Sequence, residues 1–306
     1  MLNCHRINSE AKGGDCLWFD LLDPTTEEIA RVEQAAGVSL PERASLASVE
    51  LSSRASVDGQ RLRLSVPHFT QDHSAPSPLG LILTPHHLVT LRYAAAPSFD
   101  EAAGKLATVH GPDASAEAFL LLVECVVGHV ADRVEDLAAE VDKLSANLFE
   151  RRQHGARVLR SMLNIVGRTE SRLARVRLTA SGLQRVVMFA FDNAPAWVDA
   201  RQVGRLKTAQ KDLEVLAELD GQLTDKLQFL LDAALGFINV EQNDVMKIFT
   251  VASVAAIPPI ILVGIWGMNF RHMPELSALY GYPLALAAIA TSIVVPVLWF
   301  KRKGWF

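Results

Sequence analysis

Residues 248–306 read IFTVASVAAIPPIILVGIWGMNFRHMPELSALYGYPLALAAIATSIVVPVLWFKRKGWF and decide the fold of this 306-residue chain. The charged side chains of this stretch are Arg271, Glu275, Lys301, Arg302 and Lys303. The two uncharged runs, residues 248–270 and 276–300, have 23 and 25 residues. Each run is long enough to cross a hydrocarbon core of about 30 Å. The sequence therefore predicts a membrane protein with two transmembrane helices.

The charges beside the two runs predict how the chain is oriented. Lys247 precedes the first run and three basic residues lie in the tail 301–306, whereas the connecting loop 271–275 carries one Arg and one Glu. Because basic residues are enriched in cytoplasmic segments, both termini are expected to face the cytoplasm. The protein itself is expected in the inner membrane of the cell. Residues 1–15 are polar and lack the apolar core of a secretory signal, which agrees with a cytosolic N-terminal part.

The composition of residues 1–247 excludes several functions. This part carries 26 Lys and Arg against 33 Asp and Glu, so no nucleic-acid partner is expected, whereas divalent cations suit its charge. The sequence has no Walker loop, HExxH, GxSxG or GxGxxG motif, so an enzyme is not expected. The cysteines Cys4, Cys16 and Cys125 are too few and too scattered for a disulfide framework, and all three are expected to be thiols.

Residues 1–95 are expected to form a small α/β domain. Strands are predicted at residues 17–21, 61–66 and 79–92, the last of which is interrupted by a hairpin turn at residues 84–87. A helix capped by Asp23 or Thr25 is predicted to run to about Ala36. The serine-rich residues 39–56 and the segment 71–78 are expected to be exposed loops.

The pattern changes to helices in residues 96–194, with helices expected near residues 98–109, 114–152 and 156–191. A stalk helix over residues 195–247 is then expected to continue into the first membrane run, because no proline occurs between Pro195 and Pro258. At 1.5 Å per residue, one helix from Ala196 to Gly267 is about 110 Å long. The predicted fold is an α+β cytosolic domain with a long helical stalk continuous with the first of two transmembrane helices.

Polar side chains recur on one face of this long helix. At about 100° per residue, one stripe contains Asp225, Asp232, Asn239, Asn243, Thr250, Ser253 and Ile257. Several copies of the helix around an axis would use this stripe to line a water-filled pore. In a single helix the same charges are an ordinary solvated surface, so a membrane-anchored scaffold or sensor remains an alternative.

Four motifs near the C-terminus form the basis of a family resemblance: WGMNF at residues 266–270, MPEL at 273–276, GYP at 281–283 and FKRKGWF at 300–306. In this order, and with residues 18–32 (WFDLLDPTTEEIARV), they closely resemble the CorA family of divalent-cation channels. The resemblance implies a funnel-shaped homopentamer, in which the chain assembles with four further copies of itself and the first membrane helix lines a central pore surrounded by lipid.

The resemblance also implies roles for single residues. Gly267, Met268 and Asn269 are expected to form the selectivity site, where Asn269 would contact Mg²⁺ through its hydration shell, because Mg²⁺ gives up its water reluctantly. Glu275 is the acidic residue of the external loop. By position and helical angle, the expected pore lining is Asn243, Met246, Phe249, Thr250, Ser253, Ile257 and Ile260. The apolar pair Ile257 and Ile260 favours a gate that closes by dewetting.

The external loop departs from the family pattern, and the position of the family's regulatory metal site is not fixed by the sequence. Arg271 makes the external loop formally neutral, and Thr208 stands where the family's regulatory site would place an Asp. Family channels are closed by cytosolic Mg²⁺ bound between subunits, and the candidate ligands here are Asp225, Asp232 and Asp212. Glu214, Glu218 and Asp220 lie elsewhere on the stalk, where they could reach a neighbouring subunit.

The function expected from these residues is a channel that carries Mg²⁺, with Co²⁺ or Ni²⁺ as further candidates, across the inner membrane into the cytosol. Internal Mg²⁺ is expected to gate it, and no cofactor is expected. The alternative is a zinc, cobalt or nickel transporter of the same architecture. Such metals favour thiolate and imidazole ligands, but the pore stripe has neither, and His272 is the only candidate near the mouth. The pairs His68 with His73 and His86 with His87 are expected to be surface histidines.

Overall fold

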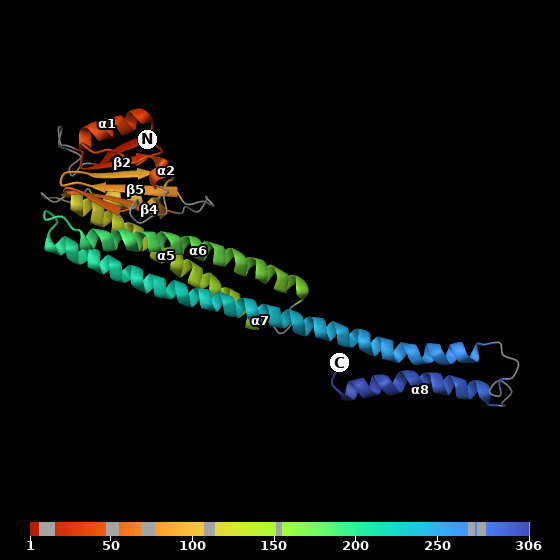
Figure 1. Ribbon diagram of the computed structural model, residues 1–306. Coiled ribbons are helices and arrows are strands. Elements are labelled where there is room, and N and C mark those ends of the chain that lie inside the picture. The colour runs from red at the N-terminus through yellow and green to blue at the C-terminus, as the bar shows by residue number, and fades with distance from the viewer. Residues whose placement is uncertain are drawn as a thin grey trace. The chain divides into compact units, whose positions relative to one another are not determined.

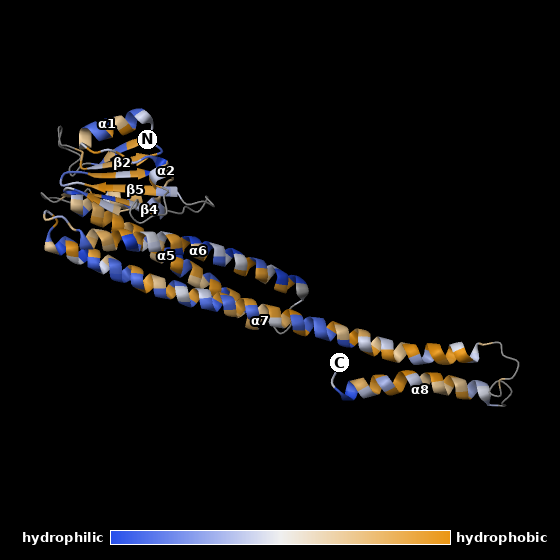
Figure 2. Cartoon of the chain, viewed as in Figure 1, coloured by the Kyte–Doolittle hydropathy of each residue, from blue (hydrophilic) through white to orange (hydrophobic). Residues whose placement is uncertain are grey.

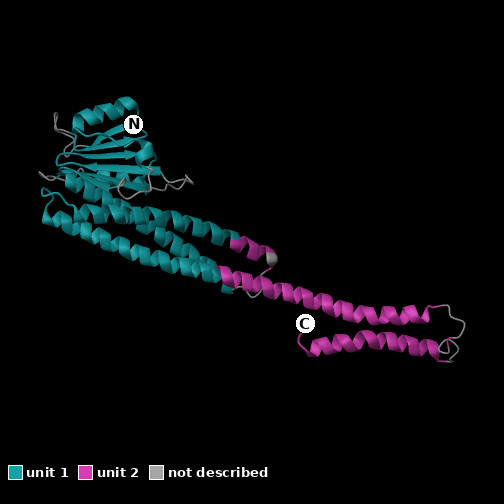
Figure 3. Cartoon of the chain, in the orientation of Figure 1, with its two compact units in different colours: residues 1–149, 164–230 teal, residues 150–163, 231–306 magenta. Residues whose placement is uncertain are grey.

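The computed structural model describes residues 1–5, 16–46, 55–68, 77–106, 114–150, 155–268, 273 and 280–305. Two compact units are present, Met1–Phe149 with Asn164–Leu230 and Glu150–Leu163 with Leu231–Phe306 (Figure 3). The N-terminal elements are β1 (Leu2–His5), β2 (Trp18–Leu22), α1 (Thr26–Ala36), α2 (Arg43–Leu46), β3 (Ala55–Asp58), β4 (Arg61–His68), β5 (Ser77–Leu83), β6 (Leu88–Arg92) and α4 (Pro97–Leu106). The long helices are α5 (Ala114–Glu150), α6 (Ala156–Asp192), α7 (Ala200–Trp266) and α8 (Gly281–Arg302).

The six strands form one mixed sheet in the order β1-β2-β6-β5-β4-β3 (Figure 1). Only β2 and β6 run parallel, with Trp18 opposite Leu88, and the other neighbours are antiparallel. The predicted hairpin is confirmed: Thr84 accepts the backbone N–H of His87 at 2.9 Å and donates its hydroxyl to the His87 carbonyl at 3.0 Å. The three predicted strands are present as β2, β4 and the β5–β6 pair, each with somewhat different ends.

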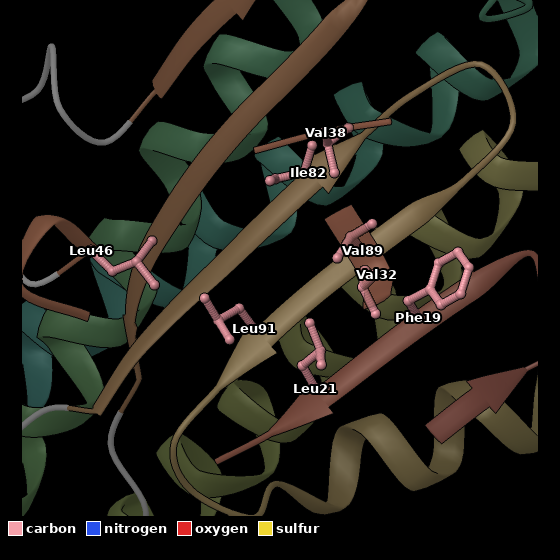
Figure 4. Close-up of a cluster of buried hydrophobic side chains, with 8 residues drawn as sticks. All are labelled: Phe19, Leu21, Val32, Val38, Leu46, Ile82, Val89 and Leu91. Atoms are coloured by element: carbon pink, nitrogen blue, oxygen red, sulfur yellow. The ribbon is translucent and has the colours of Figure 1, made fainter. Parts of the chain in front are cut away.

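Helices cover both faces of the sheet. On one face, α1 and α2 contribute to a cluster of buried side chains (Figure 4): Phe19, Leu21, Val32, Val38, Leu46, Ile82, Val89 and Leu91. On the other face, Trp18 meets Phe99 of α4 with ring centroids 6.0 Å apart. The predicted helix start is confirmed, because Thr25 and Glu28 form a reciprocal capping box.

Two predictions for the N-terminal part are wrong. Residues 39–56 were expected to be loop only, but they contain α2 and the first residues of β3, because the buried Leu46 anchors α2 to the sheet. The thiol prediction fails for Cys4 and Cys16, which form a disulfide with Cα atoms 5.7 Å apart. The antiparallel pairing of β1 with β2 brings these two residues together. Cys125 is a buried thiol, as predicted.

The predicted continuous helix is present as the 67-residue α7, about 100 Å long at 1.5 Å per residue. It begins at Ala200 and not at Ala196, because Asp199 Oδ1 accepts the N–H groups of Arg201 and Gln202 and so caps the helix start. The predicted packing stripe is buried at Leu206, Ala209, Leu213, Leu216, Leu223, Leu227, Leu230 and Ala234. Phe237 is the exception, because its side chain is exposed.

Among the described helices, α5, α7 and α8 are long and apolar enough to span a membrane. The apolar window of α5 is 67% buried inside the protein, whereas those of α7 and α8 are each 6% buried. From Ile248 onward α7 is apolar on nearly all sides, as is most of α8, whereas apolar and polar residues alternate along the earlier part of α7 (Figure 2). This difference identifies α7 and α8 as the two membrane helices and α5 as a helix of the protein interior.

Candidate functional site

The predicted pore-lining residues all lie exposed on one face of α7. The exposed fractions of Phe249 and Ile260 are 65% and 69%. The other members of this pore face are also exposed: Asn243, Met246, Thr250, Ser253 and Ile257. Thr250 donates its hydroxyl to the Met246 carbonyl at 2.8 Å, so its oxygen keeps lone pairs to accept hydrogen bonds from water. One chain thus leaves the entire face uncovered.

The opposite face of α7 is partly covered. From residue 247 to residue 266, the partly covered positions are Lys247, Val251, Ala255, Pro258, Pro259, Leu262 and Trp266. On α8 the covered positions recur at steps of three or four residues: Gly281, Ala285, Ile289, Ser292, Pro296, Val297 and Phe300. These two sets of positions indicate the faces on which α7 and α8 pack together. At about 100° per residue, the covered face of α7 is centred about 180° from the pore face.

Pro258 and Pro259 lie inside α7, and no role was predicted for them. A proline has no N–H group, so the carbonyls of Val254 and Ala255, four residues earlier, lack their usual helical donor. Free carbonyls at membrane depth are tolerated where neighbouring groups or water reach them. Two consecutive prolines in a membrane helix leave the carbonyls four residues earlier without a helical donor. Such a pair therefore indicates a helix that contacts another helix or a water-filled path.

The predicted selectivity site begins at the end of α7. The N–H of Gly267 still donates to the Val263 carbonyl at 2.9 Å, and a Cβ added to Gly267 would lie 3.0 Å from that carbonyl oxygen. Glycine at this position therefore lets the chain leave the helix without a clash. Met268 follows with 49% of its side chain exposed. Asn269, Arg271, His272 and Glu275 lie outside the described residues, and their roles stay predictions.

The three predicted regulatory aspartates, Asp212, Asp225 and Asp232, all lie exposed on α7. Within the described ranges, no group of three or more His, Cys, Asp or Glu side chains is arranged to hold a metal ion. Asp220 does not reach outward, contrary to the prediction, because it is buried and forms an ion pair with Arg177 of α6. A site built on the exposed aspartates would need ligands from another subunit.

Asp212 lines a groove of about 490 Å³ between α5 and α7, together with Thr208, Glu124 and Arg205. Arg205 donates to both carboxylate oxygens of Glu124 at 2.8 and 2.6 Å and also to Glu117. Its hydrogen bonds to Glu124 and then to Glu117 raise the pKa of Arg205. This guanidinium is already paired with two carboxylates, so with Asp212 the cluster keeps a net negative charge, and the groove does not favour one of the three predicted aspartates over another.

The histidine pairs form no such metal site in the described residues either. His87 Nδ1 lies 2.8 Å from the Cys16 carbonyl oxygen, so this ring nitrogen is occupied by the protein. His68 ends β4, and its predicted companion His73 lies outside the described residues.

Comparisons with known proteins identify the family of the chain. The family model described as "CorA-like Mg2+ transporter protein" matches residues 13–302. The magnesium transport proteins CorA of Salmonella typhimurium and of Escherichia coli K12 are each 32% identical over 295 residues, which cover 95% of this chain and 92% of theirs. The complete structure of the CorA magnesium transporter from Methanocaldococcus jannaschii superposes with a TM-score of 0.79 at 18% identity, over 97% of this chain and 94% of that one. That structure supports the fold alone, whereas the family match and the two relatives establish that this chain belongs to the CorA-like Mg²⁺ transporter family.

Proposed function

We propose that this protein is a channel that carries Mg²⁺ across the inner membrane into the cytosol. The observation that carries the proposal is the 32% identity over 295 residues to proteins named as magnesium transport proteins. The exposed pore face of α7 supports the same function, because it places hydroxyl and amide oxygens beside the apolar side chains of the part of the helix that is long and apolar enough to span a membrane. Oxygen ligands suit a hard cation. Co²⁺ and Ni²⁺ are further proposed substrates, and competition with Mg²⁺ uptake tests them.

The pore requires several copies of the chain, and we propose five. One helix cannot enclose a path for ions, and the uncovered pore face of α7 needs neighbours that shield it from lipid. The stalk offers a second contact surface, where Phe229 is 59% exposed and stacks on Phe149 with ring centroids 5.8 Å apart. Mass measurement of the purified protein in detergent should give about five copies, and a monomer or dimer would contradict the pore.

Selectivity is proposed to reside in Gly267, Met268 and Asn269, at the end of the pore face. A ring of Asn269 amide oxygens would accept hydrogen bonds from the water shell of Mg²⁺ without stripping it. Both termini are proposed to face the cytosol, so that this ring, with Glu275 behind it, meets the ion first. Internal Mg²⁺ is proposed to close the channel by binding between subunits at Asp225 and Asp232.

The decisive experiment is Asn269→Ala in cells that lack their own magnesium uptake. We expect this variant to reach the membrane and assemble but not to support growth at low external Mg²⁺. Thr291→Ala is the matched control, since it removes one polar side chain from α8, where the Thr291 hydroxyl donates to the Ala287 carbonyl of its own helix at 2.7 Å. Growth with Asn269→Ala, at equal membrane abundance, would show that the Asn269 side chain does not select the ion.

A further inference from the structure

The end of α8 is built as a compact turn. The N–H of Gly304 donates to the Lys301 carbonyl at 3.1 Å and that of Trp305 to the Phe300 carbonyl at 3.2 Å. This pair of hydrogen bonds is the Schellman arrangement. It requires a left-handed residue after the helix, and Gly304 supplies it with φ of 72°. The chain therefore folds back on the last turn of the helix.

The fold-back gathers three aromatic rings. Phe300 is 6% exposed, and its ring centroid lies 4.9 Å from that of Trp299 and 4.8 Å from that of Trp305. Phe300 and Trp305 are the two positions whose contact usually accompanies the Schellman arrangement. The two tryptophans lie on either side of a buried phenylalanine at the end of a membrane helix, and tryptophan is enriched where hydrocarbon meets headgroups.

Three basic residues lie between these tryptophans in the sequence. Lys301, Arg302 and Lys303 are all exposed, and Lys303 Nζ lies 5.1 Å from the centroid of the Trp299 ring. Within the described ranges, none of the three forms an ion pair with a carboxylate. Lys247, near the membrane end of the stalk, contrasts with them because it pairs with Asp244 at 2.7 Å.

We propose that residues 299–305 form a binding site for the headgroup of an anionic phospholipid in the leaflet where α8 ends. The lipid phosphate would accept hydrogen bonds from the ammonium and guanidinium groups, which have no competing carboxylate in the described chain. The rings of Trp299 and Trp305 would lie at the level of the headgroups and fix the depth of the site. Basic groups beside a membrane attract anionic lipids generally, but here they stand in a Schellman turn next to an aromatic cluster, and Lys303 lies over one of its rings.

The test uses the whole protein in nanodiscs. It measures which lipid stays bound and does not measure transport, so its outcome is independent of the proposed function. The discs contain phosphatidylglycerol and phosphatidylcholine, and native mass spectrometry measures which lipid stays bound after release from the disc. We expect the parent to retain phosphatidylglycerol preferentially. Each basic group near an anionic surface contributes about fivefold, so Lys301→Gln with Arg302→Gln and Lys303→Gln should lower that preference by about 100-fold.

Two further variants distinguish lipid binding by this particular turn from attraction by the net charge of the protein. Arg168→Gln with Lys207→Gln and Lys211→Gln removes three exposed charges from the helical layer and should leave the preference unchanged. Gly304→Val keeps every charge, and a Cβ at this position meets no atom within 4 Å, but valine is strained at φ of 72°. Gly304→Val should therefore weaken phosphatidylglycerol retention by disturbing the turn.

Three results would overturn the proposal: full retention by the triple variant of the tail, an equal loss in the control triple variant, or no effect of Gly304→Val. A competition experiment with inorganic phosphate completes the test. Excess phosphate at constant ionic strength should not displace phosphatidylglycerol, because free phosphate lacks the lipid anchor that holds the headgroup at this depth. Displacement would instead assign the site to soluble phosphate.

Discussion

Asp20 of β2 and Arg92 of β6 form an ion pair in the interior of the sheet domain. Arg92 Nη2 lies 2.7 Å from Asp20 Oδ2, and the two side chains are 7% and 2% exposed. Thr90 donates to the same carboxylate at 2.8 Å and accepts the indole N–H of Trp18 at 2.9 Å. The pair therefore belongs to a buried network across the parallel pairing of β2 with β6.

Removing one partner of this ion pair should lower the stability of the sheet domain strongly. Asp20→Ala leaves the Arg92 guanidinium buried without its carboxylate, and such losses cost about 3–5 kcal/mol. Asp58→Ala is the matched control, because Asp58 forms a long surface pair with Arg63 at 3.8 Å, and such pairs contribute about 0–1 kcal/mol. Hydrogen exchange of the β2 and β6 amides measures the difference. Similar protection in the two variants would show that the buried network does not hold the sheet together.

Local signals were sufficient for most of the sheet domain. The hairpin at residues 84–87 and the helix start at Thr25 were predictable because turn and cap residues act within a few positions. The strand β1 and the Cys4–Cys16 bridge were not, since both depend on pairing between segments that only the folded sheet brings together. The buried pair of Asp20 and Arg92 is a similar case: these residues are 72 positions apart in the chain.

His5 should make the edge of the sheet sensitive to acid. Burial lowers the pKa of His5 from its usual 6.5, opposed by Asp20 and Asp100 and assisted by Arg92. Because the folded state binds this proton more weakly than the unfolded state, stability should fall as the pH drops below about 6.5. Exchange of the β1 amides, corrected for intrinsic rates, should therefore speed up from pH 7.5 to 5.5. His5→Phe should remove this dependence, and its persistence would assign the effect to another group.

The disulfide should stabilise the same edge only under oxidising conditions. A bridge that closes a separation of 12 residues contributes at most about 3 kcal/mol by restricting the unfolded chain. Cys4→Ser should thus lower the protection of β1 without reductant and match the parent with reductant, as measured by hydrogen exchange. Cys125→Ser is the control, because Cys125 is not part of the bridge. An equal difference with and without reductant would mean that the thiol of Cys4, and not the bridge, stabilises the strand.

The apolar part of the pore face should resist ion flow. Rings of Ile260 from several chains would exclude water, so Ile260→Ser should increase Mg²⁺ flux into proteoliposomes when internal Mg²⁺ is low. Val263→Ser is the control: its side chain is 55% exposed, but it lies about 60° further round the helix than Ile260, at the edge of the pore face. If the two variants conduct equally, the barrier lies elsewhere on the path.

How far the site could be predicted differs between its two ends. The common face of the expected pore-lining residues was predictable because α7 is one continuous helix, so angles counted along the sequence remain valid over its whole length; their lining of a pore stays a prediction. The acidic end was less predictable, since Asp220 has the same residue type as Asp225 but is buried against Arg177. Periodicity alone does not reveal which carboxylates another helix of the same chain neutralises.

The gating prediction follows from the exposure of Asp225 and Asp232 on the stalk. If the copies of α7 surround an axis, their carboxylates repel one another unless a cation lies between them. Bound Mg²⁺ would relieve this repulsion and hold the stalks together, and its loss would let them separate.

A ligand shifts such an equilibrium only through its different affinity for the two states. Asp225→Asn with Asp232→Asn should therefore weaken inhibition by internal Mg²⁺ and leave conduction itself intact. Flux into proteoliposomes preloaded with graded Mg²⁺ measures this, and the double variant should still conduct at internal levels that close the parent. Asp132→Asn with Asp136→Asn is the control, because it removes the same charge from exposed positions of α5. Closure of the gating variant at the parent's internal Mg²⁺ level would move the sensor away from these aspartates and toward Asp212.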